Sequence, residues 1–428
     1  MSLTKTGYKP RLIDLAIEKR LSIFGAVSIE GPKWCGKTWT ALNHAASVSY
    51  MTDRSQRDLA RVDPKYIFKN ERPQLIDEWQ TVPGIWDAVR HECDSDSNKG
   101  KFLLTGSTTL LKPDDGGETV FHTGTGRIDT LRMHPMSLFE SGDSDGRVGI
   151  SDMLEGNVDS GYIRKVELGE LAQYIVRGGW PANLDTPDPD AGIIPASYIE
   201  AVVTRDIHEL SDKKRSPEKM RMLIRSLARN ESSVAGVKTL IRDIEEYDSG
   251  SELILTSATF SDYLSVLDSL YMTENQPAYS LGFRSSARVG KTAKRHLADP
   301  SLAAAALDLT VDKLLNDHET FGLLFEALAE RDLLIYALYH GARLYHFRDN
   351  LSGAEVDAIV EFRDGSYGAF EIKLSDGSIP EAIGSLTAFR DRAVKKPAFM
   401  CVITGHLEAV WQDPESGVFV VPLTSLKP

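Results

Sequence analysis

The chain has 428 residues, of which 42% are hydrophobic and 26% are charged, so it is long enough to bury two or three cores, since one core rarely grows beyond about 250 residues. The opening stretch MSLTKTGYKP has no apolar run behind its lysines, and no run of about 18 uncharged apolar residues follows, so we expect a cytoplasmic protein without a signal peptide or a membrane span. The formal net charge of −13 argues against a surface that binds nucleic acid on every side, but it allows a local basic face.

Five short apolar segments in the first third of the chain alternate with helical or polar stretches. They cover residues 25–32, 47–53, 72–79, 101–107 and 127–136. Alternation of this kind predicts a mostly parallel sheet with helices around it. Residues 110–127 and 141–161 are rich in Gly, Ser and Asp, which indicates exposed loops rather than core. We expect this α/β domain to span residues 1–190.

The sequence GPKWCGKTWT, residues 31–40, directly follows the first predicted strand. It has the spacing Gly31-x-x-x-x-Gly36-Lys37-Thr38 ahead of a helix-forming stretch, which is typical of a phosphate-binding loop. The glycines let backbone amides approach phosphate oxygens, Lys37 reaches the β and γ phosphates, and Thr38 ligates Mg²⁺. The predicted ATP-binding residues are Gly31, Pro32, Lys33, Trp34, Cys35, Gly36, Lys37, Thr38 and Trp39.

The three cysteines, Cys35, Cys93 and Cys401, lie far apart in the sequence and form neither a paired framework nor a metal-binding CxxC, which is typical of a reducing compartment. A thiol at the start of a helix is open to oxidation. For Cys35 we favour the alternative, a small residue that packs inside the loop.

An acidic pair stands at the end of the strand predicted in QLIDEW, residues 74–79. Asp77 would hold Mg²⁺ through water, and Glu78 would polarise the attacking water. With the loop, this pair predicts an ATPase that uses Mg²⁺. The competing interpretation is an ordinary glycine turn followed by an unrelated acidic strand end.

Six motifs, in order, resemble those of prokaryotic AAA-type ATPases that carry a C-terminal domain of unknown function. They are residues 31–38, LIDEW at 75–79, LTGST at 104–108, GTGR at 124–127, RGGWP at 177–181 and VVTRDI at 202–207. The resemblance extends over nearly the whole chain. Its ATPase motifs are specific for nucleotide chemistry, whereas the later motifs identify the family without indicating its task.

The resemblance also implies roles for polar residues beyond the loop. Thr105 or Ser107 would sense the γ-phosphate, and Arg127 would reach the nucleotide of a neighbouring copy in a homo-oligomer. Arg177 or Arg205 would approach the nucleotide as a sensor arginine. The alternative for each arginine is a surface or packing residue that forms a salt bridge.

The pattern turns helical from about residue 194, and residues 256–281 predict a capped helix followed by a short hairpin, as in a winged helix-turn-helix. We expect this middle domain to span residues 191–290. Two basic clusters flank the hairpin: Lys213, Lys214, Arg215, Lys219, Arg221 and Arg225, and then Arg284, Arg288, Lys291, Lys294 and Arg295. Such clusters suit a DNA backbone, although a solvated charged face is the default interpretation.

Residues 291–428 predict a third, α/β domain with strands at 343–349, 354–362, 367–375 and 398–405 and a helix after Pro380. Glu326 in a helix, Asp357 in a strand, and Glu371 and Lys373 two residues apart in the next strand resemble the PD-(D/E)xK nuclease fold. Asp357 and Glu371 can share Mg²⁺ while Lys373 orients water. The alternative is a salt bridge between Lys373 and a carboxylate.

The sequence therefore predicts an α/β protein with a P-loop AAA-type ATPase domain, a helical and winged-helix middle, and a restriction-endonuclease-like C-terminal domain. We expect it to bind ATP and ADP and to hydrolyse ATP with Mg²⁺, coupled to DNA binding or processing. Two other hypotheses remain. One is a nucleotide-gated signalling switch whose C-terminal domain only binds protein, and the other is an ATP-regulated nuclease.

Overall fold

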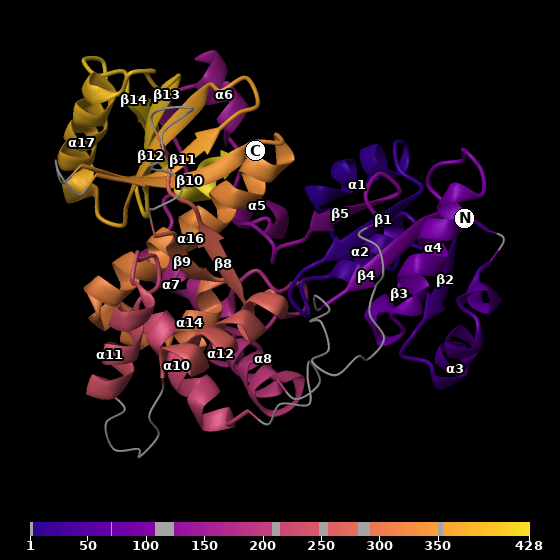
Figure 1. Cartoon of the computed structure of the whole chain (residues 1–428). Helices are drawn as coiled ribbons and strands as arrows, with labels where there is room; N and C mark the ends of the chain where they lie inside the picture. The colour runs from indigo at the N-terminus through magenta and orange to yellow at the C-terminus, as the bar shows by residue number, and fades with distance from the viewer. Residues whose placement is uncertain are drawn as a thin grey trace. The chain divides into compact units, whose positions relative to one another are not determined.

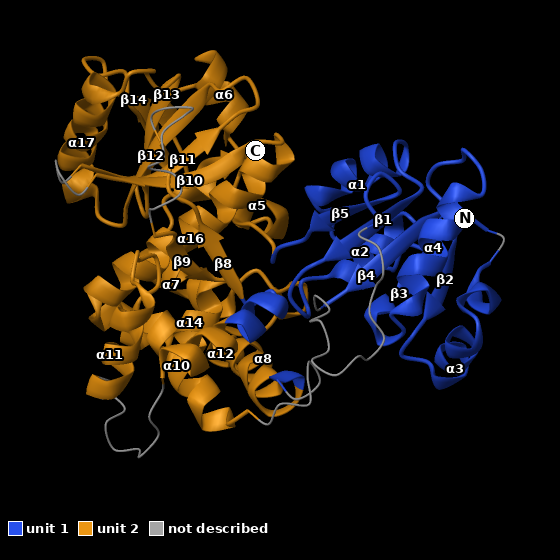
Figure 2. Cartoon of the chain, viewed as in Figure 1, with its two compact units in different colours: residues 1–135, 206–214, 265–272 blue, residues 136–205, 215–264, 273–428 orange. Residues whose placement is uncertain are grey.

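The computed structural model describes residues 3–69, 71–107, 124–207, 215–247, 256–280, 292–349 and 354–428. The chain divides into two compact units, coloured blue and orange in Figure 2. Unit 1 comprises residues 1–135, 206–214 and 265–272, and unit 2 comprises residues 136–205, 215–264 and 273–428. This division differs from the predicted boundaries at residues 190 and 290, because residues 136–205 pack with later parts of the chain.

Unit 1 contains a five-stranded sheet in which every neighbouring pair of strands is parallel. Its strands are β1 (Ala26–Glu30), β2 (Ser47–Tyr50), β3 (Gln74–Asp77), β4 (Phe102–Gly106) and β5 (Ile128–Arg132), in the order β2-β3-β4-β1-β5. All five strands lie in the segments where the sequence predicts them. The predicted parallel α/β sheet is thus confirmed.

Helices surround this sheet (Figure 1). They are α1 (Ile13–Leu21), α2 (Lys37–Asn43), α3 (Arg54–Val62) and α4 (Gly84–Asp94), with two 3-10 turns, η1 (Pro64–Ile67) and η2 (Trp79–Thr81). One face of the sheet packs on α3, η1 and α4 through a cluster that includes Ile76, Phe102, Ile85 and Trp86. Strand side chains alternate, so Val27 and its equivalents point to the opposite face, where α1 and α2 contact the strands.

Unit 2 contains a seven-stranded mixed sheet. In spatial order its strands are β10 (Arg343–Arg348), β11 (Glu355–Glu361), β12 (Tyr367–Lys373), β13 (Phe399–Thr404), β15 (Phe419–Pro422), β14 (Ala409–Gln412) and β7 (Gly161–Tyr162). Two helices, α16 (His318–Tyr339) and α17 (Ile379–Arg392), pack against the interior strand β12. The strands predicted at 343–349, 354–362, 367–375 and 398–405 and the helix predicted after Pro380 are present. The nuclease-like fold itself stays a prediction.

Residues 141–161 are not the exposed loops that the sequence predicts. This region contains α5 (Leu138–Ser141), β6 (Val148–Gly149), α6 (Ile150–Glu155) and β7. Val148, Ile150 and Met153 are buried, and β6 pairs with β16 (Leu426–Lys427) near the end of the chain. The prediction is wrong because it follows the many turn-forming residues of this region. The few apolar residues among them are buried by partners that lie far away in the sequence. Of the other predicted loop, residues 110–123 lie outside the described residues.

The rest of unit 2 is mainly helical. Its helices are α7 (Leu168–Arg177), α8 (Ile193–Ala201), α10 (Pro217–Arg229), α11 (Val237–Tyr247), α14 (Pro300–Ala306) and α15 (Val311–Asn316), while the π-helix η5 (Val202–Asp206) and helix α12 (Ser257–Ser269) extend into the segments grouped with unit 1. Two short strands, β8 (Thr273–Gln276) and β9 (Lys294–Leu297), pair antiparallel after α12. A helix followed by a two-stranded ribbon fits the predicted layout, and the winged-helix assignment stays a prediction. No helix in the described part of the chain has the length and hydropathy needed to cross a bilayer.

Candidate functional site

The predicted phosphate-binding loop connects β1 to α2 in unit 1. Gly31 has φ +154°, and a Cβ atom there would lie 2.1 Å from the carbonyl oxygen of Met133. Gly36, at the N-cap of α2, has φ 104°. These positions require glycine, because other residues rarely adopt such φ values and no side chain fits against Met133. The backbone is therefore shaped as a phosphate-binding loop requires.

Lys37 is buried at the first residue of α2. Its Nζ donates to the carbonyl oxygens of Gly31 at 2.9 Å and of Pro32 at 2.7 Å. The ammonium group thus lies over the loop and is fixed by loop carbonyls. Phosphate oxygens would offer it stronger, charged acceptors at the same place.

Asp77 joins the loop to the ends of two neighbouring strands. Its Oδ1 accepts hydrogen bonds from Thr38 Oγ1 and from Thr105 Oγ1, each at 2.7 Å. Asp77 and Thr105 are register partners on β3 and β4, so the parallel sheet brings them together. Carboxylate and hydroxyl oxygens are hard donors of the kind that Mg²⁺ prefers, so Thr38 and Asp77 fit the predicted metal role.

Glu78 follows β3 with left-handed backbone angles, φ 57° and ψ 46°. Its backbone N–H donates to Thr105 Oγ1 at 3.3 Å, and its Oε2 accepts from Ser107 Oγ at 3.1 Å. The side-chain amide of Gln80 also donates to this oxygen. The structure therefore brings together Asp77, Glu78, Thr105 and Ser107, as the sequence predicts. Gln80 was missed, because a glutamine beside an acidic pair carries no recognisable signal.

The other predicted loop residues have different surroundings. Lys33 forms an ion pair with Asp206 at 2.7 Å. Trp34 and Trp39 are 47% and 46% exposed, so their rings are accessible to a ligand. Cys35 is buried, with its Sγ 3.8 Å from the carbonyl oxygen of Met133. The burial supports the packing interpretation for this cysteine.

Arg11 contacts the loop through its guanidinium group, and no motif in the sequence predicts this contact. Its guanidinium is buried and donates to the carbonyl oxygens of Cys35 and of His134, both at 2.8 Å. Arg11 thus ties the loop to the chain after β5. Burial lowers the pKa of His134 to about 3, so this imidazole is neutral in the folded protein.

The predicted arginines are ion-paired or exposed. The half-exposed Arg127 places its Nε 2.7 Å from Asp94 Oδ1, and this hydrogen bond lowers the pKa of Asp94. Arg177 is buried in unit 2, with its Nη2 2.5 Å from Asp143 Oδ2. Arg205 is exposed in the π-helix. These positions do not test the predicted roles, which stay predictions.

The RGGWP motif has a structural role in unit 2. A Cβ atom on Gly179 would lie 2.1 Å from the carbonyl oxygen of Met136, and the Gly179 N–H donates to Asp299 Oδ2 at 3.0 Å. Trp180 is buried and donates through Nε1 to Ser301 Oγ at 2.8 Å. The motif therefore joins α7, α14 and the chain near residue 136.

The four residues of the predicted nuclease-like site converge between α16, β11 and β12. Lys373 Nζ lies 2.8 Å from Glu371 Oε2 and 3.4 Å from Asp357 Oδ2. Asp357 Oδ2 also accepts from the backbone N–H of Ile372 at 2.8 Å. Glu326 of α16 interacts electrostatically with Asp357 and Lys373, and burial raises the pKa of Glu326 and of Glu371 to about 7. We call Glu326, Asp357, Glu371 and Lys373 the carboxylate cluster.

Lys294 of β9 also reaches this cluster, and no sequence signal separates it from a surface lysine. Its Nζ lies 2.6 Å from Glu330 Oε1 and forms a second ion pair with Glu326. Glu330 in turn contacts His296, whose Nε2 lies 3.4 Å from Glu330 Oε2. Among the described residues, no three His, Cys, Asp or Glu side chains are grouped so that they could hold a metal ion.

Three described members of the basic clusters are buried or ion-paired, whereas Arg225 is exposed, and contact with DNA stays a prediction. Arg215 is buried and pairs with Asp262 at 3.1 Å, Arg221 pairs with Glu200 at 2.8 Å, and Lys294 is buried. Sequence spacing alone could not show that acidic partners from other helices neutralise these cations. Five more of the basic residues lie outside the described residues: Lys213, Lys214, Arg284, Arg288 and Lys291.

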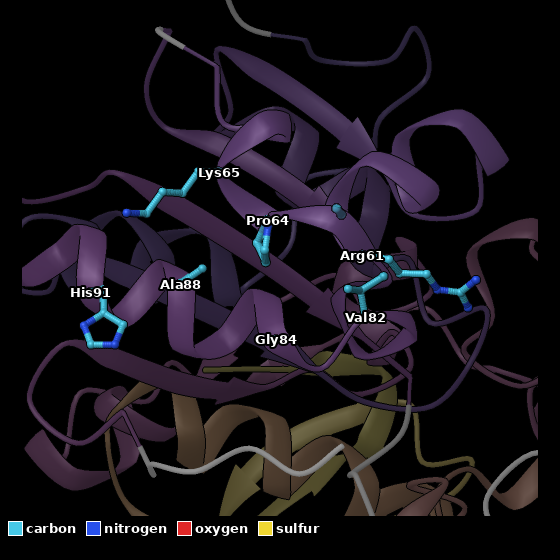
Figure 3. A pocket seen from close by; sticks show the side chains of 8 residues that line it. Arg61, Pro64, Lys65, Val82, Gly84, Ala88 and His91 are labelled. Atoms are coloured by element: carbon cyan, nitrogen blue, oxygen red, sulfur yellow. The ribbon is translucent and has the colours of Figure 1, made fainter. Parts of the chain in front are cut away.

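Unit 1 also has a pocket of about 350 Å³ over α3, η1 and α4 (Figure 3). The Arg61 and Lys65 side chains extend to opposite sides of Pro64 in this view. The residues that line the pocket are Ala60, Arg61, Pro64, Lys65, Val82, Gly84, Ala88 and His91. None of them belongs to the predicted phosphate-binding loop or to the acidic pair after β3, so this pocket is separate from the predicted nucleotide site.

Three family models match successive parts of the chain. Residues 24–141 match an AAA domain, residues 168–313 match a domain of unknown function (DUF8612), and residues 321–426 match a domain of unknown function (DUF4143). The match over residues 24–141 supports the predicted AAA-type P-loop domain in this part of the chain, a kind of domain that implies nucleotide binding. No curated protein is similar enough to the chain to count as a match.

Several solved structures align with the chain at 13% identity. A Walker-type ATPase of Pyrococcus abyssi aligns over 72% of this chain and 98% of its own, with a TM-score of 0.41. The ORC1 protein of Aeropyrum pernix in complex with DNA aligns over 71% and 94%, with a TM-score of 0.26. The ORC2 protein of the same organism, in ADPNP and ADP complexes, aligns over 73% and 97%, with a TM-score of 0.31. All three TM-scores are below 0.5.

Proposed function

We propose that unit 1 binds ATP at the loop from Gly31 to Thr38 and hydrolyses it with Mg²⁺. The observation that carries this proposal is the convergence of Thr38 and Thr105 on Asp77, beside a buried Lys37. A coordinated cation and a lysine that both face phosphate oxygens are what phosphoryl transfer requires. The match of residues 24–141 to an AAA domain supports the same reaction.

Each residue has a distinct role in this proposal. Lys37 exchanges its loop carbonyl acceptors for β and γ phosphate oxygens, and Thr38 and Asp77 would hold Mg²⁺, which supplies charge neutralisation on the phosphates. The Glu78 carboxylate accepts a hydrogen bond from the attacking water and orients it. Ser107 and Gln80 fix that carboxylate, and Thr105 fixes the backbone of Glu78.

The test is steady-state ATP hydrolysis by the full chain in Mg²⁺, with and without EDTA. We expect turnover in Mg²⁺, loss of turnover in EDTA, and a fall of at least about 100-fold in Lys37→Ala. Lys19→Ala removes an exposed lysine from α1 and serves as the matched control, with turnover equal to that of the parent. Equal turnover in Lys37→Ala and Lys19→Ala would contradict the proposal.

A second candidate function is metal-dependent cleavage of DNA by unit 2, coupled to the ATPase. The observation that favours it is the convergence of Asp357 and Glu371 on Lys373 next to Glu326. A lysine beside two carboxylates can orient water for attack on a phosphodiester. We propose DNA as the substrate because the sequence of this region resembles the PD-(D/E)xK nucleases.

Three outcomes of one assay separate the candidate functions. Linear, branched and single-stranded DNA are incubated with the full chain, Mg²⁺ or Mn²⁺, and ATP. Faster ATP turnover with DNA supports DNA handling, and cleavage that disappears in Lys373→Ala supports an ATP-regulated nuclease. If neither effect is observed, the hypothesis that remains is a nucleotide-gated switch whose C-terminal domain binds protein.

A further inference from the structure

The predicted phosphate-binding loop carries a second lysine, Lys33, whose partner lies in the VVTRDI motif. Its Nζ is 2.7 Å from Oδ1 of Asp206, and the Lys33 side chain is 33% exposed. Both residues belong to unit 1. Lys37, by contrast, is buried and contacts carbonyl oxygens of the loop itself. Lys33 is thus held by a carboxylate that comes from outside the loop.

Asp206 is buried, and only part of its hydrogen-bonding capacity is used. The residue is 4% exposed, and its Oδ2 has no hydrogen-bond partner among the residues that the structure describes. A carboxylate oxygen that is buried without a donor is costly, because it loses its contacts with water and gains none in return. Asp206 therefore depends on Lys33 to compensate its charge.

The backbone that carries Asp206 is irregular. Asp206 is the last residue of the π-helix η5, which follows α8 without a break. Turns of π-helix are rare and occur frequently at functional sites. The contact with the loop is therefore made from an irregular turn rather than from a regular helix.

ATP bound in the loop would compete with Asp206 for Lys33. The phosphates bring several negative charges, and each phosphate oxygen is a charged acceptor for the lysine ammonium group. If Lys33 turns to the phosphates, Asp206 is left as a buried charge without compensation, which is strongly destabilising. The phosphates also repel the Asp206 carboxylate. Both effects drive Asp206 away from the loop.

We propose that Asp206 is a further residue of the nucleotide site, which holds Lys33 until the phosphates of ATP take Lys33 from it and release η5. The inference rests on the proposed function of unit 1, since it concerns the same loop. Asp206 is a positioning residue, because it acts on the phosphates through Lys33. A pair that only fastened the loop to η5 would weaken ATP binding when it is broken, whereas competition predicts tighter binding.

The affinity of the full chain for a non-hydrolysable ATP analogue with Mg²⁺ tests this competition. We expect Asp206→Asn to bind the analogue at least about fivefold more tightly than the parent, the lower end of the usual coupling between two linked equilibria. Asparagine keeps the size of the side chain and removes the charge that holds Lys33. The matched control is Asp159→Asn, which removes the same charge from an exposed residue and should leave the affinity unchanged.

Hydrogen exchange of the backbone amides of residues 202–207 separates competition from simple charge repulsion. We expect these amides to exchange faster when the parent binds the analogue, because Asp206 then loses Lys33. In Lys33→Met the ion pair is absent from the start, so the analogue should leave the exchange unchanged. This second measurement does not require Asp206→Asn to fold.

Equal or weaker binding by Asp206→Asn, or exchange that does not rise in a parent that binds the analogue, would overturn this inference and leave the proposed function intact. A parent chain that does not bind the analogue at all would overturn both.

Discussion

Asp77 is the residue on which the nucleotide site depends most, because one of its oxygens accepts hydrogen bonds from both Thr38 and Thr105. Thr38 belongs to the loop, whereas Thr105 is the penultimate residue of the neighbouring strand β4 and also accepts a hydrogen bond from the N–H of Glu78. A single hydroxyl group thus positions both the proposed metal ligand and the residue proposed to orient water.

Replacing that hydroxyl by a methyl group tests this arrangement. We expect Thr105→Val to lower ATP turnover by about 10- to 100-fold, because a hydrogen bond to a charged group contributes about 1.5–3 kcal/mol. The affinity for ATP should stay close to that of the parent, since Thr105 contacts no loop residue that binds phosphate. Thr130→Val, on the exposed side of β5, is the matched control. Turnover equal in the two variants would remove Thr105 from the site.

His134 makes the stability of unit 1 depend on pH. Burial lowers its pKa from 6.5 to about 3, so the unfolded chain takes up this proton more readily than the folded one. The contribution of the neutral His134 to the stability of unit 1 is fully present above pH 6.5 and is lost as the pH falls towards 3. As the pH falls from 6.5 towards 3, we expect His134 to lower the free energy of unfolding by about 1.4 kcal/mol for each pH unit.

Denaturant unfolding of unit 1, measured between about pH 4 and pH 7, gives the change in the free energy of unfolding with pH. This pH range covers most of the interval over which the shifted pKa has its effect. His134→Gln should flatten the pH dependence by the contribution of one proton. An unaltered slope in the variant would show that His134 has the same pKa in the folded and the unfolded chain.

Individual elements were predictable where the sequence pattern is local. The five parallel strands of unit 1 are nearly continuous apolar runs, because both faces of a parallel sheet are covered by helices. Strands β6 and β7 have only two residues each and find their partners in β16 and β14. Pairing between distant segments leaves no periodic signal in so short a strand, which is why the sequence of residues 141–161 predicts loops.

The turn between α7 and η3 (Pro181–Asn183) depends on its glycines. We expect Gly179→Ala to destabilise unit 2 by more than about 2 kcal/mol, because the new methyl group would lie 2.1 Å from the carbonyl oxygen of Met136. Gly169→Ala is the matched control, since a Cβ atom there meets nothing within 4 Å in α7. That substitution should stabilise the chain by about 0.5–1 kcal/mol. Thermal unfolding of the two variants compares them directly, and equal stability would contradict the packing described for RGGWP.

Across the chain, the sequence predicts the parts that a short motif encodes. The loop, the Asp77–Glu78 pair and the meeting of Asp357 with Glu371 and Lys373 follow from spacing and from the way in which strands align. Arg11, Gln80 and Lys294 were not predictable, because each reaches its site from an element with no fixed spacing to the motif. The acidic partners of Arg215, Arg221 and Lys294 were not predictable for the same reason, since they come from other helices.

The assembly of several copies is a prediction that concerns Arg127. If Arg127 serves the nucleotide of a neighbouring copy, turnover per subunit should rise with protein concentration, and mixing Arg127→Ala with Glu78→Gln subunits should restore part of the activity. Arg127 must then exchange Asp94 for phosphate. Sedimentation and turnover measured over the same concentrations check this. Full activity in a sample that sediments as a monomer would exclude a role in trans.

In the proposed mechanism, the loop of unit 1 binds ATP and Glu78 directs water to it. The most direct test of this mechanism is the Glu78→Gln variant, in which ATP affinity and ATP turnover are measured on the same sample in Mg²⁺. We predict an affinity close to that of the parent, because Glu78 lies outside the phosphate-binding loop, together with turnover lowered by at least about 100-fold. Turnover at the parent rate would contradict the assignment of Glu78, and loss of ATP binding would contradict the separation of binding from water activation.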